Sequence, residues 1–310
     1  MFKRKTTALM SAFSIAIMLS ACQPKSKQDE PNINEPAASE VVVETKHLNG
    51  EIQRLNLGLP KCDGNNCSEL VVERLSSNYP FIDAWVDEKI ASLLAETLSD
   101  APQDNTKIQA DDTNAASEVV GVSAKLKLEQ KLATYKNAFL ALDQELKALS
   151  AGHPINVMIK PKILNAEEPV ATVVLNSSSY LGGAHGSTSQ LYYNFDLNTE
   201  KRLLLSDLLE PNKANVLKEK FYAAFKTWVI DSELTDNVEE YEQAWPFKMT
   251  DNFYLGKQGL ILQYGEYEMG PYVVGLPRLV IPYNELEGIL KPEYLPEALR
   301  HQSAASEVQP

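Results

Sequence analysis

The 310-residue sequence predicts an α+β fold: an antiparallel sheet with helices packed on one face, arranged as two successive α+β subdomains. Three observations predict it. Apolar residues in 122–150 recur three and four positions apart, which is the period of a helix. From residue 155 the period falls to two, and β-branched and aromatic residues dominate as they do in strands. A second helical stripe at 212–230 is then followed by further strand-like segments.

The first half of the chain contains two predicted strands, at 51–62 and 68–75, and two predicted helices. One helix follows Pro80, where apolar side chains are spaced for a helical face. The longer helix at 122–150 ends before Gly152. The apolar residues that mark these helices are Phe81, Trp85 and Leu93 in the first, and Leu128, Leu132, Tyr135, Phe139, Leu142, Leu146 and Leu149 in the second.

The second half alternates strands with one strong helix. Residues 196–200 predict a hairpin turn, from which a strand leaves towards 205–209. The helix at 212–230 carries an apolar stripe that we interpret as core, and not as a cofactor site. That stripe consists of Leu217, Phe221, Ala224, Phe225 and Trp228, and the strand-like segments are 155–164, 168–181, 187–197, 252–265 and 277–286.

The N-terminus has the layout of a bacterial lipoprotein signal. Three basic residues precede an uncharged apolar run from Ala8 to Ala21, which is too short to span a bilayer. The run ends in "LSAC", which resembles a lipobox and predicts lipidation of Cys22 after removal of residues 1–21. Because Gln23, and not aspartate, follows Cys22, we expect a lipid anchor in the outer membrane, with the protein facing the periplasm or the cell surface.

Composition predicts the remaining domain boundaries. A polar, proline-containing disordered tether should occupy 22–46, and a low-complexity mobile insertion about 99–118. The expected N-terminal α+β domain is 47–152, and the C-terminal domain is 153–295. Residues 296–310 are expected to form a tail.

Two cysteines remain after Cys22 is assigned to the lipid. Cys62 and Cys67 flank the turn-forming "DGNN", and an exported protein folds in an oxidising compartment. A small disulfide loop is therefore predicted. Zinc is the alternative, although no second cysteine or histidine pair accompanies the motif.

The charge of the chain limits its partners. The formal charge is −13, and removing residues 1–21 removes three bases, which leaves 26 bases against 42 acids, or −16. This excess of acid argues against nucleic acid and anionic lipid surfaces as partners. The excess of acid favours a cationic partner. It is equally explained if the negative charge only keeps the protein soluble.

The stretch "YLGGAHG" (180–186) raises the question of a catalytic histidine. Gly182 and Gly183 permit a sharp bend between two strands, and His185 could lie at the rim, contact a partner or take part in chemistry. The four histidines, His47, His153, His185 and His301, show no metal-binding spacing, and the sequence contains no H-E-x-x-H, G-x-S-x-G, phosphate-loop or dinucleotide motif. We therefore assign no catalytic residue, metal or cofactor, and expect a protein that is not an enzyme.

A family resemblance covers about residues 155–290. "YLGGAHG" followed by "YYNFDLNTEKRLLLSDLL", and later "NFYLGKQGLILQYGEYEMGPYVVGLPRLVIPYNEL", resemble the RsiV-type extracytoplasmic domain. Residues 50–152 resemble less closely the companion domain found in RsiV and in the peptidoglycan deacetylase PdaC. The resemblance implies a domain that binds lysozyme as receptor and inhibitor. We expect a lipid anchor in place of a cytoplasmic segment, so the sigma-factor role of RsiV is not expected.

The expected function is therefore a non-enzymatic envelope lipoprotein that binds a cationic protein such as a lysozyme-like muramidase. Its segment 231–270 carries nine acids and two bases, and tyrosines are favoured in binding surfaces. The alternatives are a peptidoglycan- or ester-directed envelope hydrolase and a structural or assembly lipoprotein of the outer membrane. The candidate partner-binding residues are His185, Tyr180, Glu266, Tyr267, Glu268 and Tyr272.

Replacing Cys22 by serine tests the predicted anchor. We expect Cys22→Ser to accumulate as the uncleaved precursor and to incorporate no labelled palmitate, because the thiol that accepts the lipid is gone. Metabolic labelling followed by membrane fractionation measures both effects. Equal palmitate incorporation by the variant and the parent chain would contradict the lipobox interpretation.

Overall fold

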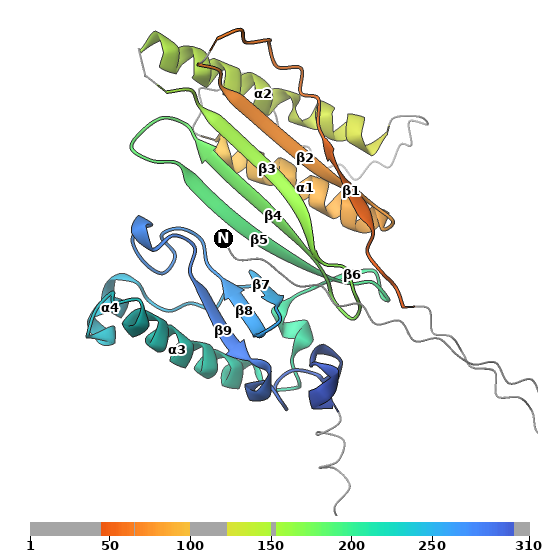
Figure 1. Ribbon diagram of the computed structural model, residues 1–310, viewed down its shortest axis with the longest axis vertical. Coiled ribbons are helices and arrows are strands. Elements are labelled where there is room, and N and C mark those ends of the chain that lie inside the picture. Colours follow the sequence, from red (N-terminus) through yellow and green to blue (C-terminus); the bar gives the residue numbers. More distant parts are fainter. Residues whose placement is uncertain (1–44, 65, 100–122, 150–152, 301–310) are drawn as a thin grey trace, which may run out of the picture. The chain divides into compact units, whose positions relative to one another are not determined.

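The larger of two sheets contains six strands, and their order in space is their order in the chain (Figure 1). Neighbouring strands are antiparallel except β2 and β3, which run parallel because a helical crossover joins them. Strands on both sides of the predicted boundary at 152/153 thus pair in one sheet. The strands are β1 (Gly50–Arg54), β2 (Glu69–Ser77), β3 (Asn156–Asn165), β4 (Ala171–Tyr180), β5 (Ser187–Asp196) and β6 (Lys201–Leu203).

This computed structural model describes residues 45–64, 66–99, 123–149 and 153–300. The predicted signal peptide, Cys22 and nearly all of the predicted tether and insertion lie outside these ranges, as do residues 301–310 of the predicted tail. None of the helices in the described ranges is long and apolar enough to cross a membrane.

Two helices cover one face of the larger sheet, as predicted (Figure 1). The first, α1 (Pro80–Thr97), begins at the proline, and the carboxylate of Asp83 accepts hydrogen bonds from the backbone N–H and hydroxyl of Ser77. The second, α2 (Ala124–Ala148), begins after Ser123, whose side chain accepts from the N–H of Leu126. Both helices therefore have local sequence signals at their N-termini.

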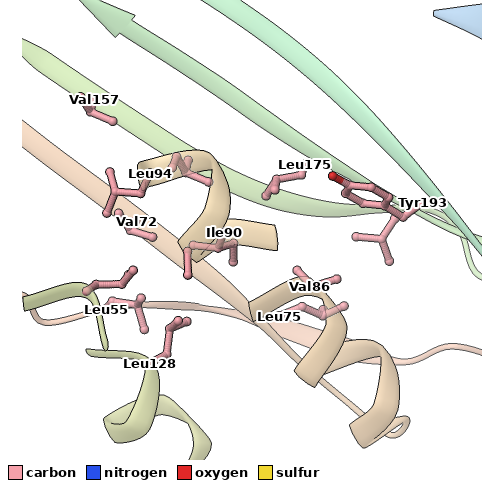
Figure 2. Close-up of a cluster of buried hydrophobic side chains, with 14 of the residues drawn as sticks. Leu55, Val72, Leu75, Val86, Ile90, Leu94, Leu128, Val157, Leu175 and Tyr193 are labelled. Atoms are coloured by element: carbon pink, nitrogen blue, oxygen red, sulfur yellow. The ribbon is translucent and has the colours of Figure 1, made fainter. Parts of the chain in front are cut away.

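The helices and the sheet enclose one apolar core (Figure 2). Ile90 and Leu94 of α1 are fully buried, as are Leu75 of β2 and Leu175 of β4. Burying one such side chain stabilises the fold by about 1.5–3 kcal/mol. The core thus fixes α1 and α2 against the central strands.

The connection from β1 to β2 contains the predicted disulfide. Cys62 and Cys67 are bonded to each other, with their Cα atoms 5.8 Å apart. The disulfide prediction is confirmed.

A second unit follows in the chain and has its own core. Its three-stranded antiparallel sheet packs against α3 (Ala214–Asp231), whose Phe221 and Phe225 are fully buried. A short helix, α4 (Val238–Ala244), forms inside the acidic stretch, where Asn237 caps its N-terminus and acidic residues fill its first turn. The strands are β7 (Phe253–Leu255), β8 (Gly259–Gln263) and β9 (Arg278–Pro282), and four short 3₁₀-helices complete the described elements: η1 (Leu205–Leu208), η2 (Tyr272–Val274), η3 (Tyr283–Glu285) and η4 (Pro292–Tyr294).

Strand β5 carries most contacts between the two sheets. The buried side chain of Asn194 donates to the carbonyl oxygen of Phe253 at 2.8 Å and accepts from the hydroxyl of Thr172 at 2.9 Å. Next to it, the rings of Tyr192 and Tyr254 stack with centroids 4.2 Å apart. The predicted α+β class, with helices on one face of a sheet, is confirmed, and the sheet is antiparallel except between β2 and β3.

Replacing Asp87 tests a buried ion pair between β2 and α1. Arg74 is only 3% exposed, and its guanidinium donates to both oxygens of Asp87 at 2.9–3.2 Å. Burial raises the pKa of Asp87, and the hydrogen bonds from Arg74 oppose that rise only in part. We expect Asp87→Ala to lower the free energy of unfolding by about 3–5 kcal/mol, because an unpaired buried cation remains.

Urea denaturation measures this loss. The double variant Arg74→Met/Asp87→Leu should recover most of it, because no buried charge remains. If Asp87→Ala lowered the free energy of unfolding by less than about 1 kcal/mol, the Arg74–Asp87 pair would behave as a surface ion pair, and its interpretation as a buried pair would be wrong.

Candidate functional site

The "YLGGAHG" stretch forms the turn between β4 and β5. Gly182 and Gly183 have φ angles of 94° and 97°, a region that side chains with a Cβ rarely adopt. The hydroxyl of Tyr180 donates to the carbonyl oxygen of Gly183 at 3.1 Å and closes the turn. At Gly186, a Cβ would lie 2.7 Å from the carbonyl oxygen of Ser179. The predicted glycine-dependent bend is confirmed, and Tyr180 supports it from within.

His185 projects from this turn and contacts two tyrosines of the loop between β8 and β9. Its ring stacks on Tyr272, with centroids 3.8 Å apart and an interplanar angle of 19°. Its Nε2 lies 3.1 Å from the hydroxyl oxygen of Tyr267, and its Nδ1 lies 3.0 Å from the carbonyl oxygen of Gly186. Three predicted candidates from distant parts of the sequence therefore form one cluster. We call His185, Tyr267 and Tyr272 the aromatic rim.

The backbone of the β8–β9 loop is held in an unusual shape at the aromatic rim. Tyr267 has a φ angle of 62°, which is uncommon for a residue other than glycine. The side chain of Glu268 accepts from the N–H of Gly265 at 2.6 Å and braces this turn. Glu268, a predicted partner contact, thus has a structural bond within its own loop.

Glu266 joins the same loop to the beginning of β5. Its carboxylate accepts from the hydroxyl of Ser187 at 3.0 Å, and from the N–H and hydroxyl of Thr188 at 2.9 and 2.7 Å. This carboxylate is therefore already hydrogen-bonded to other residues of the same chain. Its assignment as a partner contact stays a prediction.

Asn252 forms hydrogen bonds to the outer edge of β5, which is the edge that faces away from β4. This role of Asn252 was not predicted from the sequence. Strand β6 pairs only with residues 194–196, so the earlier part of this edge has no strand beside it among the described residues. The Oδ1 of Asn252 accepts from the N–H of Tyr192 at 2.7 Å, and its Nδ2 donates to the carbonyl oxygen of Gln190 at 2.8 Å. One side-chain amide thus makes the two bonds that a neighbouring strand would make. We call Asn252 and Glu266 the β5 latch.

A pocket of about 660 Å³ lies beside the β5 latch. Its walls come from the end of α1, the turn after β4, the first half of β5 and the loops on either side of the β7–β8 hairpin. Four predicted candidates line it: His185, Glu266, Tyr267 and Glu268. Glu96 and Thr250 also line it, and no local motif in the sequence marks either residue.

Two buried tyrosines near the pocket have raised pKa values. Burial raises the pKa of Tyr193 to about 12; Arg202 opposes the rise and Glu96 adds to it. Burial also raises the pKa of Tyr264, whose hydroxyl donates to the carbonyl oxygen of Lys248 at 2.8 Å. Both hydroxyls therefore stay protonated at neutral pH, and that of Tyr264 acts as a donor.

Of the other histidines that the structure describes, His47 and His153 are not part of this cluster. The Nδ1 of His47 lies 2.9 Å from a carboxylate oxygen of Glu167, and His301 lies outside the described residues. Among the residues that the structure describes, no group of three or more His, Cys, Asp or Glu side chains could hold a metal ion.

The fold and the site define a class of α+β protein in which a small three-stranded unit is joined to the partly unpaired side of strand β5 in a larger sheet. Residues 206–284, from η1 to η3, match the family described as "Protein of unknown function (DUF3298)". The family match covers less than half of the chain and includes the whole of the β8–β9 loop.

Solved structures show the same fold over most of the chain. A crystal structure of a DUF3298 family protein from Pseudomonas aeruginosa PAO1 is 25% identical, with a TM-score of 0.54, and the match covers 81% of this chain and 96% of that one. A DUF3298 family member from Bacteroides fragilis NCTC 9343 is 19% identical, with a TM-score of 0.50 and coverage of 81% and 94%.

Among curated proteins, the chain is similar to the peptidoglycan-N-acetylmuramic acid deacetylase PdaC of Bacillus subtilis (strain 168). The two are 24% identical over 138 residues, which is 44% of this chain and 30% of PdaC. The expected resemblance to PdaC is confirmed as a distant similarity over less than a third of that protein.

Replacing Asn252 tests the β5 latch. We expect Asn252→Ala to lower the free energy of unfolding by about 1–3 kcal/mol, because two partly buried backbone groups of β5 lose their partner. Urea denaturation measures the loss, and faster hydrogen exchange of the Tyr192 amide locates it. Asn198→Ala, in the exposed β5–β6 turn, is the matched control, and an equal effect of both variants would contradict the latch.

Proposed function

We propose that the protein is a non-enzymatic binding protein of the cell envelope, which contacts its partner through the aromatic rim. One observation carries this proposal: large apolar side chains are exposed together on one braced loop. Tyr267 is 50% exposed, Tyr272 is 38% exposed, and Val273 beside them is 87% exposed. Exposed tyrosines that are already held in place lose little conformational freedom on binding, and such residues are common binding hot spots.

Attachment to the outer membrane through a lipid on Cys22 is part of this proposal. The lipobox at residues 19–22 and the apolar run before it support this location. The distant similarity to PdaC, whose name describes action on peptidoglycan, also supports a place in the envelope.

A cationic protein is the partner that fits this surface best. The chain without residues 1–21 has a formal charge of −16. The acidic helix α4 contacts the β8–β9 loop directly, because the hydroxyl of Tyr241 donates to the carbonyl oxygen of Met269 at 2.7 Å. Glu239 and Glu240 on α4 are exposed, so negative charge lies on the element that supports the aromatic rim.

A lysozyme-like muramidase is the specific partner that we propose. The resemblance of residues 155–290 to the RsiV-type domain supports it, and lysozymes of animal origin are strongly basic. Binding or inhibiting such an enzyme would require a shaped anionic surface and no chemistry at His185.

Lysozyme binding tests the proposal. We expect the purified chain to bind hen lysozyme, and raising the sodium chloride concentration should weaken binding because charge steers the association. Tyr272→Ala should weaken it by about tenfold or more, as expected for a tyrosine hot spot. Surface plasmon resonance measures both effects.

The matched control is Ile52→Ala, which removes an exposed apolar side chain from β1, away from the rim. It should leave the affinity unchanged. Absence of binding at low ionic strength would exclude lysozyme as the partner. Binding with equal affinity by the parent chain and Tyr272→Ala would exclude the aromatic rim as the contact surface.

A peptidoglycan- or ester-directed hydrolase is the second candidate. The name of PdaC and the position of His185 on the pocket wall favour it. Release of acetate from peptidoglycan or from an aryl ester, lost in His185→Ala, would support this candidate over binding alone. Co-purification with an outer-membrane assembly would instead support the structural alternative.

A further inference from the structure

The pocket beside the β5 latch is large enough for a small ligand. Its volume of about 660 Å³ lies inside the range of roughly 300–1,000 Å³ that is typical of ligand sites. Glu266 and Asn252 hold its walls together through five hydrogen bonds to β5. The pocket is therefore a built feature of the fold, with walls that do not need a ligand to form.

The lining of the pocket is rich in groups that bind hydroxyls. Side-chain hydroxyls and amides cover the β5 wall and the opposite loop. Most of them already bond within the chain, and a ligand would use the hydrogen-bonding capacity that remains, such as the second lone pair of a hydroxyl. This lining consists of Ser179, Ser187, Thr188, Ser189, Gln190, Thr250 and Asn252. A ligand that carries many hydroxyl groups matches it.

The charge of the pocket selects among such ligands. Glu96, Glu266 and Glu268 line it, and no lysine or arginine does so among the described residues. Glu266 and Glu268 accept hydrogen bonds from neutral donors within the chain. Anionic sugars and phosphates are therefore disfavoured, and a cationic group is favoured.

Glu96 is the carboxylate that remains available to a ligand. It lies on the last turn of α1 and is exposed, and its side chain makes no hydrogen bond to any residue that the structure describes. An amine that reaches it forms a charge-assisted hydrogen bond without displacing an internal contact. The aromatic residues Tyr267 and His185 also line the pocket, and aromatic rings are common partners for the apolar side of a sugar ring.

We propose that this pocket binds a short oligosaccharide that carries free amino groups, with Glu96 as the residue that recognises an amine. The ligand is a small carbohydrate, unlike the protein partner proposed for the aromatic rim. The two proposals use different discriminating residues: Glu96 lines the pocket and lies outside the rim, while Tyr272 belongs to the rim and does not line the pocket.

Three tetrasaccharides of different charge test the proposal by isothermal titration calorimetry with the full chain in a zwitterionic detergent. The cationic probe is the glucosamine tetramer, the neutral probe is its fully N-acetylated form, and the anionic probe is tetragalacturonate. We expect the glucosamine tetramer to bind most tightly. The neutral form should bind more weakly by about tenfold or more, as for the loss of one hydrogen bond between charged groups. Tetragalacturonate should not bind.

The variant Glu96→Gln separates the pocket from general charge attraction. It should weaken binding of the glucosamine tetramer by about tenfold or more and leave the N-acetylated tetramer unchanged, because only the amine uses the carboxylate. Glu88→Gln removes one exposed charge from the same helix outside the pocket and is the matched control. Thermal melting of each variant checks that the fold is kept.

Two results would overturn the proposal. One is the absence of binding by the glucosamine tetramer. The other is an equal effect of Glu96→Gln and Glu88→Gln, which would mean that the acidic surface attracts the probe without a defined site. Neither result bears on lysozyme binding, which is measured separately with Tyr272→Ala.

Discussion

The outer edge of β5 is the constraint on which the rest of the structure depends. An unpaired strand edge exposes backbone donors and acceptors that need partners, and β6 pairs with only three residues of β5. The second unit supplies side-chain partners for the remainder. Asn252 bonds to the backbone of Gln190 and Tyr192, and Glu266 bonds to Thr188.

The same bonds create both candidate binding features. Because Glu266 ties the β8–β9 loop to the start of β5, Tyr267 and Tyr272 come to lie against His185. The space left between the β5 edge, the end of α1 and this loop is the pocket. The aromatic rim, for which we propose a protein partner, and the pocket, for which we propose a carbohydrate, thus share one structural origin.

Features that depend on local pattern could be predicted from the sequence. The helical stripes predicted α1, α2 and α3 to within a few residues, and the alternating segments predicted most strands of both sheets. Strand β1 ends at Arg54 and not at 62, and residues 205–208 form a 3₁₀-helix where a strand was expected. The helix α4 was not predicted, because its short acidic segment has no apolar period and depends on a cap at Asn237. The parallel pairing of β2 with β3 was not predicted either, because partners about 87 residues apart in the sequence leave no local signal.

The sequence by itself determined the three longer helices, most of the strands, the Cys62–Cys67 disulfide, the excess of negative charge and the glycine-dependent bend before His185, since each depends on neighbouring residues. Only the tertiary structure decided which acidic side chains form hydrogen bonds within the chain and which line the pocket. Glu266 and Glu96 are indistinguishable as carboxylates in an acidic sequence, yet one is bonded to β5 and the other faces a pocket. The reason is physical: the environment of a charged group is set by the residues that long-range packing brings to it, and those residues lie far away in the chain.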